Sequence, residues 1–224
     1  MTVSKKPDIT FYTADTPNGL KVALFLHEAG IPFERRFVDL SAGEQHQPAF
    51  LAINPNGKIP AIVDHEAGIT LFESGAILTR LSDKYPLFKP DSLKGQCQVQ
   101  QWLHFQIGGI GPMMGQLWWF LHGSKTRNEE ALARYRKETL RLLGVVEKQL
   151  QISPYLAGDT YTIADMAAFS WLRTWHELDL DLSAFPAVMA WLTALSARPA
   201  VKEAINVNMI RDSVTIINTH SGNA

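Results

Sequence analysis

Residues 54–76, Asn-Pro-Asn-Gly-Lys-Ile-Pro-Ala-Ile-Val-Asp-His-Glu-Ala-Gly-Ile-Thr-Leu-Phe-Glu-Ser-Gly-Ala, are the stretch that decides the fold. Two short β-rich runs, 61–64 and 69–72, flank a turn, and this spacing predicts a hairpin. Pro60 stands directly before the first run, where a proline is tolerated because its missing N–H lies outside the ladder. Glu73 and Ser74 open an apolar-periodic segment that predicts a helix.

Two features of this stretch indicate a ligand site. If the Ile59–Pro60 bond is cis, which costs an X-Pro bond only about 0.5–1 kcal/mol, the backbone N–H and C=O of Ile59 face outward. Such unpaired groups can hold an extended peptide as an added strand would be held. At the next helix start, Ser74 and the helix N-terminus favour an anion, and Glu73 favours an ammonium. A peptide main chain beside an amino-acid zwitterion describes glutathione, γ-Glu-Cys-Gly.

Lys58-Ile59-Pro60 followed by Glu73-Ser74 resembles the glutathione-binding half of the cytosolic glutathione transferase superfamily. The alternative is a hairpin whose proline and helix-capping serine serve folding alone. Each feature taken singly favours that alternative, whereas the whole set in this order and spacing favours the ligand site.

The composition is that of an ordinary globular protein. The chain has 224 residues and a formal net charge of −1, so it carries no electrostatic footprint for nucleic acid or anionic lipid. Cys97 is the only cysteine, which excludes an intrachain disulfide and fits a reducing compartment, so we expect a cytoplasmic protein. The histidines show no metal-ligand spacing, and no stretch resembles a signal peptide or a membrane span. We expect no metal, no nucleic acid partner and no membrane.

The order of the expected elements gives the fold class. A strand, a helix, a strand and a short helical piece precede the opening stretch, at residues 9–13, 20–29, 33–40 and 47–53. With the hairpin and the helix after it, short connections imply a small mixed sheet with helices packed on it. This order resembles a thioredoxin fold.

The second half of the sequence predicts helices. Residues 129–150 form the clearest amphipathic helix, and Thr162 with Asp165 has the spacing of a capping box at a helix start. Two further helix starts and one run whose conformation the sequence leaves open lie at 185–186, 198–199 and 214–217. We expect a thioredoxin-like α/β domain at residues 1–85 and an all-α domain at residues 86–224, as in the glutathione transferase fold.

Glutathione reacts as its thiolate, and an isolated thiol with a pKa near 8.5 is only a few per cent ionised at pH 7. One hydrogen bond to the charged sulfur, worth about 1.5–3 kcal/mol, lowers that pKa by about one to two units. Tyr12, Thr16 and Asn18, around the end of the first strand, compete as donors. Packing is the favoured role of Tyr12, and a turn or capping role is the alternative for Thr16.

The run Thr16-Pro17-Asn18-Gly19-Leu20-Lys21-Val22 resembles the bacterial nu class of this superfamily and the glutathione transferase-like domain of the yeast nitrogen-catabolite regulator. A second set of residues resembles the same class: Gln101-Trp102-Leu103, Gly108-Gly109, Gly111-Pro112-Met113, Gly115-Gln116 and Arg134-Tyr135. The resemblance implies that Thr16 and Asn18 contact the glutathione sulfur.

The resemblance implies the remaining contacts one residue at a time. Gln45 and Lys58 hold the glycine end, and Ile59 pairs its backbone with the cysteine residue. Glu73 and Ser74 bind the γ-glutamyl end. Arg134 reaches into the site of the neighbouring subunit, which presumes a homodimer; a solvated helix arginine is the alternative.

For function, the resemblance implies a glutathione-dependent disulfide-bond oxidoreductase with weaker peroxidase or transferase activity. In the absence of a site cysteine, the bound glutathione thiolate attacks the disulfide and a second glutathione completes the exchange. Two alternatives stay open. One is a conventional glutathione S-transferase that conjugates apolar electrophiles, and the other is a non-catalytic scaffold or regulator, because a fold does not imply an activity.

Three further features are expected to serve structure. The glycines around Pro112 should loosen or break a helix. The cluster Trp118-Trp119-Phe120 is expected in the core, although it could line an apolar pocket, and Cys97 is expected to be a packed thiol.

Overall fold

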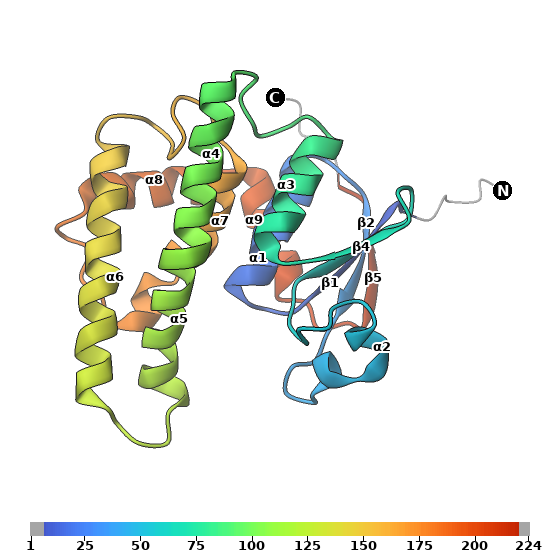
Figure 1. Ribbon diagram of the computed structural model, residues 1–224, viewed down its shortest axis with the longest axis horizontal. Coiled ribbons are helices and arrows are strands. Elements are labelled where there is room, and N and C mark those ends of the chain that lie inside the picture. The colour runs from blue at the N-terminus through green and yellow to red at the C-terminus, as the bar shows by residue number, and fades with distance from the viewer. Residues whose placement is uncertain (1–6, 220–224) are drawn as a thin grey trace. The chain divides into compact units, whose positions relative to one another are not determined.

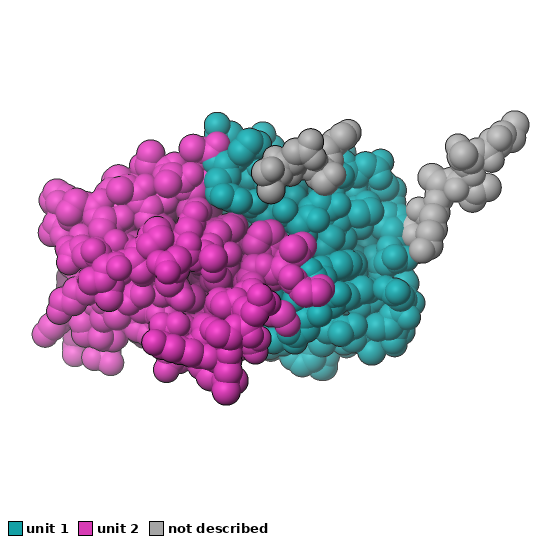
Figure 2. All heavy atoms as spheres, turned by 90° about the horizontal axis from the view of Figure 1, so that it is seen from above, with its two compact units in different colours: residues 1–85, 198–224 teal, residues 86–197 magenta. Residues whose placement is uncertain are grey.

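The computed structural model describes residues 7–219, which fall into two compact units. One unit takes in the described residues up to Tyr85 together with those from Arg198 onward, and the other is Pro86–Ala197 (Figure 2). The division after Tyr85 lies where the sequence placed it. The expected second domain of residues 86–224 differs from the structure at its end, because the last segment packs with the first unit.

A mixed five-stranded sheet in the order β4–β3–β1–β2–β5 is the centre of the first unit (Figure 1). β1 (Ile9–Thr13) pairs in parallel with β2 (Phe33–Phe37) and antiparallel with β3 (Ala61–Asp64). β3 forms the expected hairpin with β4 (Ile69–Phe72). The order and directions of these strands confirm the thioredoxin-like arrangement.

Helices cover both faces of this sheet. α1 (Pro17–Glu28) packs against both α3 (Ser74–Lys84) and α9 (Pro199–Asn208). Phe11 of β1 contacts Phe33, which in turn contacts His27 of α1. The next residue, Tyr12, points to the opposite face, as successive strand residues do. There it packs against Phe50 of the short helix α2 (Pro48–Leu51).

The C-terminal strand β5 (Val214–Ile217) extends the sheet in a way that the sequence left open. It pairs antiparallel with β2 and so covers what would be an unpaired edge. Arg35 of β2 is fully buried, and its guanidinium donates hydrogen bonds to three backbone carbonyls of the returning segment, those of Asn208, Ile210 and Asp212. These contacts explain why the chain from Arg198 onward belongs to the first unit.

The second unit is helical. Its α-helices are α4 (Leu93–Phe105), α5 (Gly111–Trp118), α6 (Glu129–Leu150), α7 (Ile163–Leu172) and α8 (Pro186–Ala197). The capping box is confirmed, because the Asp165 carboxylate accepts a hydrogen bond from the Thr162 amide at 3.0 Å. No helix of the part described, residues 7–219, is long and apolar enough to cross a membrane.

The glycines around Pro112 loosen the helix as expected without breaking it, because a π-helical turn at Gln106–Ile110 joins α4 to α5. A second π turn at Trp119–Gly123 follows α5. Two other expectations for this unit are wrong. Trp118 and Trp119 are 44% and 48% exposed and Phe120 is half-buried, because three consecutive helical residues point to different sides and cannot all face the core. Cys97 is also exposed, since the buried stripe of α4 runs through Gly95, Val99 and Leu103.

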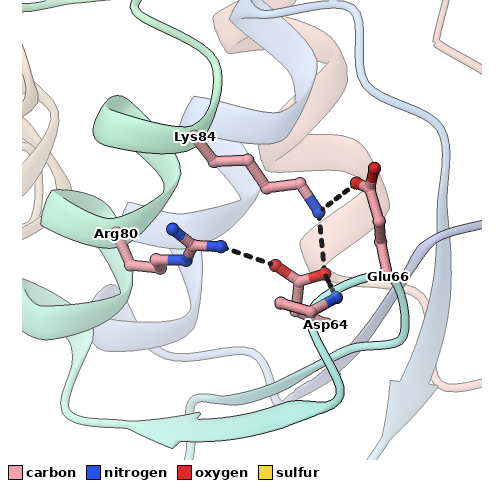
Figure 3. A network of polar contacts seen from close by, with 5 residues as sticks. Asp64, Glu66, Arg80 and Lys84 are labelled. Carbon is pink, nitrogen blue, oxygen red and sulfur yellow. Dashed lines mark hydrogen bonds and ion pairs between the residues drawn. The ribbon is translucent and has the colours of Figure 1, made fainter.

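A buried carboxylate ties the C-terminal end of α3 to the hairpin (Figure 3). Asp64 accepts hydrogen bonds from Lys84 Nζ at 2.7 Å and from the Ala67 amide at 3.1 Å, and Arg80 Nη2 lies 3.5 Å from its other oxygen. Lys84 Nζ also lies 2.9 Å from Glu66. Burial opposes ionisation, but these hydrogen bonds and the charges of Lys84 and Arg80 outweigh it and hold the pKa of Asp64 below its ordinary value.

Because the pKa of Asp64 is depressed in the folded state, its carboxylate adds stability above its unfolded pKa, near 3.9, and this stability is lost as the pH falls through the lower folded pKa. We expect Asp64→Asn to lower the free energy of unfolding at pH 7 by about 1.5–3 kcal/mol, the value of a charged hydrogen bond. Urea denaturation of both proteins should show this difference narrowing below about pH 4. A difference that stays constant with pH would contradict the assignment.

Candidate functional site

The strand register brings most of the predicted site residues to one end of the sheet. Tyr12 of β1 lies opposite Ala61 of β3, and Ala61 lies opposite Phe72 of β4. The β1–α1 connection with Thr16 therefore leaves the sheet where the loop before β3 enters it and where β4 runs into α3. Figure 1 shows these three connections at the same end of the strands.

Thr16 is the N-cap of α1, as its alternative role predicted. Its Oγ1 accepts a hydrogen bond from the Gly19 amide at 3.1 Å. A hydroxyl has two acceptor lone pairs and one donor hydrogen, so capping leaves that hydrogen able to reach an anion outside the helix. Capping and sulfur binding are therefore compatible roles for Thr16. Asn18 lies in the first turn of the same helix and is, like Thr16, half-buried.

Gly19 allows α1 to begin this close to β1. A Cβ added there would lie 2.3 Å from Thr13 Oγ1 and 2.7 Å from the Ala14 carbonyl oxygen. The loop that carries Thr16 is also supported from α9, by a side chain that is nearly 200 positions away in the sequence and is almost fully buried. Asn208 Nδ2 lies 3.5 Å from both the Thr16 carbonyl and an Asp15 carboxylate oxygen.

The loop before β3 presents Lys58 and Ile59. The Ile59–Pro60 bond is cis, and Ile59 lies outside the strand, which begins at Ala61. Buried Asn54 holds the loop from within: its Oδ1 accepts from the Asn56 amide at 2.9 Å, and its Nδ2 donates to the Lys58 carbonyl. Lys58 itself is exposed.

Gln45 lies beside this loop. A Cβ added at Gly57 would lie 3.3 Å from the Gln45 carbonyl oxygen, so the two segments touch. The side-chain Nε2 donates to the Leu40 carbonyl at 3.3 Å, while its Oε1 is buried and has no partner among the described residues. Because that oxygen is buried, the side chain must move before a ligand N–H can donate to it.

Glu73 and Ser74 stand at the start of α3, where Glu73 has an unfavourable backbone conformation and Ser74 is buried against a lysine. Glu73 has φ 69° and ψ 112°, a conformation that costs a non-glycine residue about 1–3 kcal/mol and that clusters at ligand sites. Ser74 is 8% exposed, and its Oγ accepts a hydrogen bond from Lys21 Nζ at 3.2 Å. Lys21 is 2% exposed, and burial lowers its pKa to about 7 although the charge of Glu73 acts in the opposite direction.

Tyr12 has the packing role expected of it. Its ring meets that of Phe50 edge-on, with centroids 6.0 Å apart, within a cluster that includes Val38 and Ala61. The guanidinium carbon of Arg36 lies 5.9 Å from the centroid of the same ring.

Comparison with known proteins identifies the family. The family model of the glutathione S-transferase N-terminal domain matches residues 7–82, and that of the C-terminal domain matches residues 110–199. The chain is also 44% identical over 202 residues to the disulfide-bond oxidoreductase YfcG of Escherichia coli (strain K12), which covers 88% of this chain and 94% of that protein. The chain belongs to the glutathione S-transferase family.

Solved structures of glutathione transferases agree with this assignment. One from Burkholderia graminis, with two glutathione molecules bound per subunit, is 38% identical with a TM-score of 0.85, over 92% of this chain and 90% of that chain. One from Pseudomonas putida, with one glutathione disulfide bound per subunit, is 34% identical with a TM-score of 0.85, over 92% of this chain and 94% of that chain. The expected fold class is thereby confirmed.

Arg134 is the predicted site residue that the first unit does not contain. It is exposed on α6 of the second unit, so its place at a neighbouring subunit's site stays a prediction. Among the residues that the structure describes, no group of three histidine, cysteine or acidic side chains could hold a metal ion.

Three residues that support the site of this glutathione S-transferase were given no role from the sequence: Lys21, Asn54 and Asn208. Lys21 had a visible signal, because it is the one charged residue in the apolar run from Leu20 to Leu26. The contacts of Asn208 join segments far apart in the chain, so no local pattern could indicate them.

The close approach at Gly19 gives a paired prediction. Alanine is favoured over glycine inside a helix by about 1 kcal/mol, but at Gly19 the added Cβ meets backbone, so we expect Gly19→Ala to lower the free energy of unfolding by about 1–3 kcal/mol. Gly144 in α6 has no atom within 4 Å of an added Cβ, so Gly144→Ala should stabilise instead. Urea denaturation measures both, and equal effects would contradict the steric argument.

Proposed function

We propose that this chain is a glutathione-dependent disulfide-bond oxidoreductase in which the thiolate of bound glutathione is the nucleophile. The observation that carries the proposal is the Thr16 hydroxyl, which caps α1 through its oxygen and keeps its hydrogen to donate. The name of the Escherichia coli relative and the glutathione disulfide bound in the Pseudomonas putida structure support the same reaction class.

We propose that the segments at this end of the sheet each bind a different part of glutathione. Ser74 and the N-terminus of α3 take the γ-glutamyl carboxylate, and Glu73 takes the ammonium. The backbone of Ile59 pairs with the cysteine residue as an added strand would. Lys58 takes the glycine carboxylate by charge, and Gln45 holds the same glycine end by hydrogen bonds.

At the sulfur, Thr16 and Asn18 donate to the thiolate. A charge-assisted hydrogen bond favours the ionised form over the thiol. Cys97 is the only cysteine and lies on α4, outside the first-unit segments that we assign to glutathione. Glutathione therefore provides the reacting sulfur.

The reaction then takes two exchanges. The glutathione thiolate attacks one sulfur of the substrate disulfide, a new S–S bond forms to glutathione, and the other substrate sulfur leaves as a thiolate that takes up a proton. A second glutathione thiolate attacks the glutathione sulfur of this mixed disulfide and releases the remaining substrate thiol and glutathione disulfide. The two glutathione molecules per subunit in the Burkholderia graminis structure support a site with room for both.

Beside the disulfide reduction we propose a weaker peroxidase or transferase activity. Conventional conjugation as the main activity is the second candidate. The exposed rings of Trp118 and Trp119 favour conjugation, because they offer an apolar surface to an electrophile. Comparing the rates with hydroxyethyl disulfide and with a haloaromatic substrate separates the two functions, and a faster rate with the haloaromatic would overturn the proposal.

We further infer a cytoplasmic homodimer in which Arg134 of one subunit completes the site of the other.

Binding tests the γ-glutamyl subsite. Glu73→Gln and Ser74→Ala each remove one partner of the zwitterion, which is worth about 1.5–3 kcal/mol, so glutathione should bind about ten- to a hundredfold more weakly. Titration calorimetry measures the dissociation constants. Unchanged values for both variants would mean that the ligand lies elsewhere.

The sulfur contact has its own test. Thr16→Ala should raise the pKa of the bound glutathione thiol by about one to two units, because only the thiolate gains from the hydroxyl. Disulfide reduction should then slow near neutral pH and recover at higher pH. Ultraviolet titration of the bound thiolate gives the midpoint directly.

Two matched variants complete that test. Thr16→Ser keeps both the cap and the hydroxyl and should restore the wild-type midpoint, while Tyr12→Phe should leave it unchanged. A midpoint that moves with Tyr12→Phe and not with Thr16→Ala would replace the proposed mechanism with that of a tyrosine-dependent transferase.

A further inference from the structure

Lys21 is a buried lysine in an apolar run of α1. It is 2% exposed, and within residues 7–219 its Nζ donates a hydrogen bond to the neutral hydroxyl of Ser74. Burying an ammonium is expensive unless it is paired with an opposite charge. A residue that opposes folding in this way is expected to serve a ligand.

The hydrogen bond between Lys21 and Ser74 indicates how Lys21 can act on a ligand. Lys21 Nζ donates to Ser74 Oγ at 3.2 Å and so occupies a lone pair of the hydroxyl. The hydroxyl hydrogen must then point away from Lys21, toward whatever binds at the start of α3. The ammonium also adds a full positive charge to the partial positive charge of the helix N-terminus.

We propose that Lys21 is a positioning residue for the γ-glutamyl carboxylate. It orients the Ser74 hydroxyl, and its positive charge, on the protein side of that hydroxyl, attracts the carboxylate. The inference rests on the proposed glutathione site and adds to it a residue that does not touch the reacting sulfur.

Binding of a carboxylate beside Lys21 changes the protonation of its side chain. Burial lowers the pKa of Lys21 to about 7, so near neutral pH the free protein holds this side chain partly uncharged. A carboxylate arriving nearby favours the ammonium, so binding takes up a proton. Glu73 is the charged group that faces Lys21 from α3. On α9, the other helix packed against α1, Glu203 lies 3.7 Å from His27 and Lys202 is exposed.

Lys21→Met, which keeps the length of the side chain without its charge, is the direct test. The probe is S-methylglutathione, because its sulfur cannot ionise and so adds no proton of its own. Calorimetry near pH 7 in two buffers of different ionisation enthalpy should show about tenfold weaker binding and no proton uptake. The melting temperature of the ligand-free variant should equal or exceed that of the wild type, since a buried charge has been removed.

Three controls separate positioning from folding. Lys84→Met removes another largely buried lysine, the partner of Asp64, and should lower stability without changing affinity. In a Ser74→Ala background, Lys21→Met should cost much less affinity, because the two residues act as a unit. The analogue 4-aminobutanoyl-Cys-Gly, which lacks the γ-glutamyl carboxylate, should bind wild type and Lys21→Met equally.

The outcomes distinguish this inference from the function on which it rests. If wild-type protein fails to bind S-methylglutathione, the proposed function itself is wrong. If wild type binds, Ser74→Ala weakens binding and Lys21→Met does not, the Lys21 inference alone is overturned. Lys21→Gln serves as a second uncharged variant, and loss of folding in both variants would show that Lys21 supports the fold and would also overturn it.

Discussion

The register of three strands is the constraint on which the site depends. Tyr12, Ala61 and Phe72 lie side by side across β1, β3 and β4, so the segments that follow or precede them meet at one end of the sheet. A slip of one residue between two of these strands would turn each side chain to the other face and move its connection along the edge. The proline before β3 and the tight hairpin to β4 leave little freedom for such a slip.

Residues from α9 onward support the loop between β1 and α1. α9 packs on α1, Asn208 approaches the loop that carries Thr16, and Arg35 holds the segment between α9 and β5 by its backbone carbonyls. The loop that carries Thr16 is therefore supported by residues from the C-terminal part of the described chain. Such long-range contacts oppose local opening of a loop.

Local patterns predicted the parts of this architecture that depend on neighbouring residues. The hairpin, the proline at strand entry, the start of α3 at Ser74 and the Thr162–Asp165 capping box each follow from residue types a few positions apart. What the sequence could not give depends on distant contacts or on helix phase. Pairing of β5 with β2 joins residues far apart in the chain. Residue type alone does not say which side of a helix faces the core, so Trp118 and Trp119 were expected there although they are exposed.

The start of α3 carries two energetic costs at adjacent positions. Glu73 is held at positive φ, and Ser74 rests on a buried ammonium, whereas the other end of the same helix is secured by the ion pairs of Asp64. A stable helix end can therefore offset strain at the opposite end. Strain and an incompletely paired charge persist where the surrounding structure enforces them. In the proposed complex, the ammonium of the zwitterion meets the carboxylate of Glu73, while its carboxylate meets Ser74 and the nearby charge of Lys21. Binding of an amino-acid end would thus pair the charge that is incompletely paired in the protein alone, which is a physical reason for the proposed preference for the γ-glutamyl end.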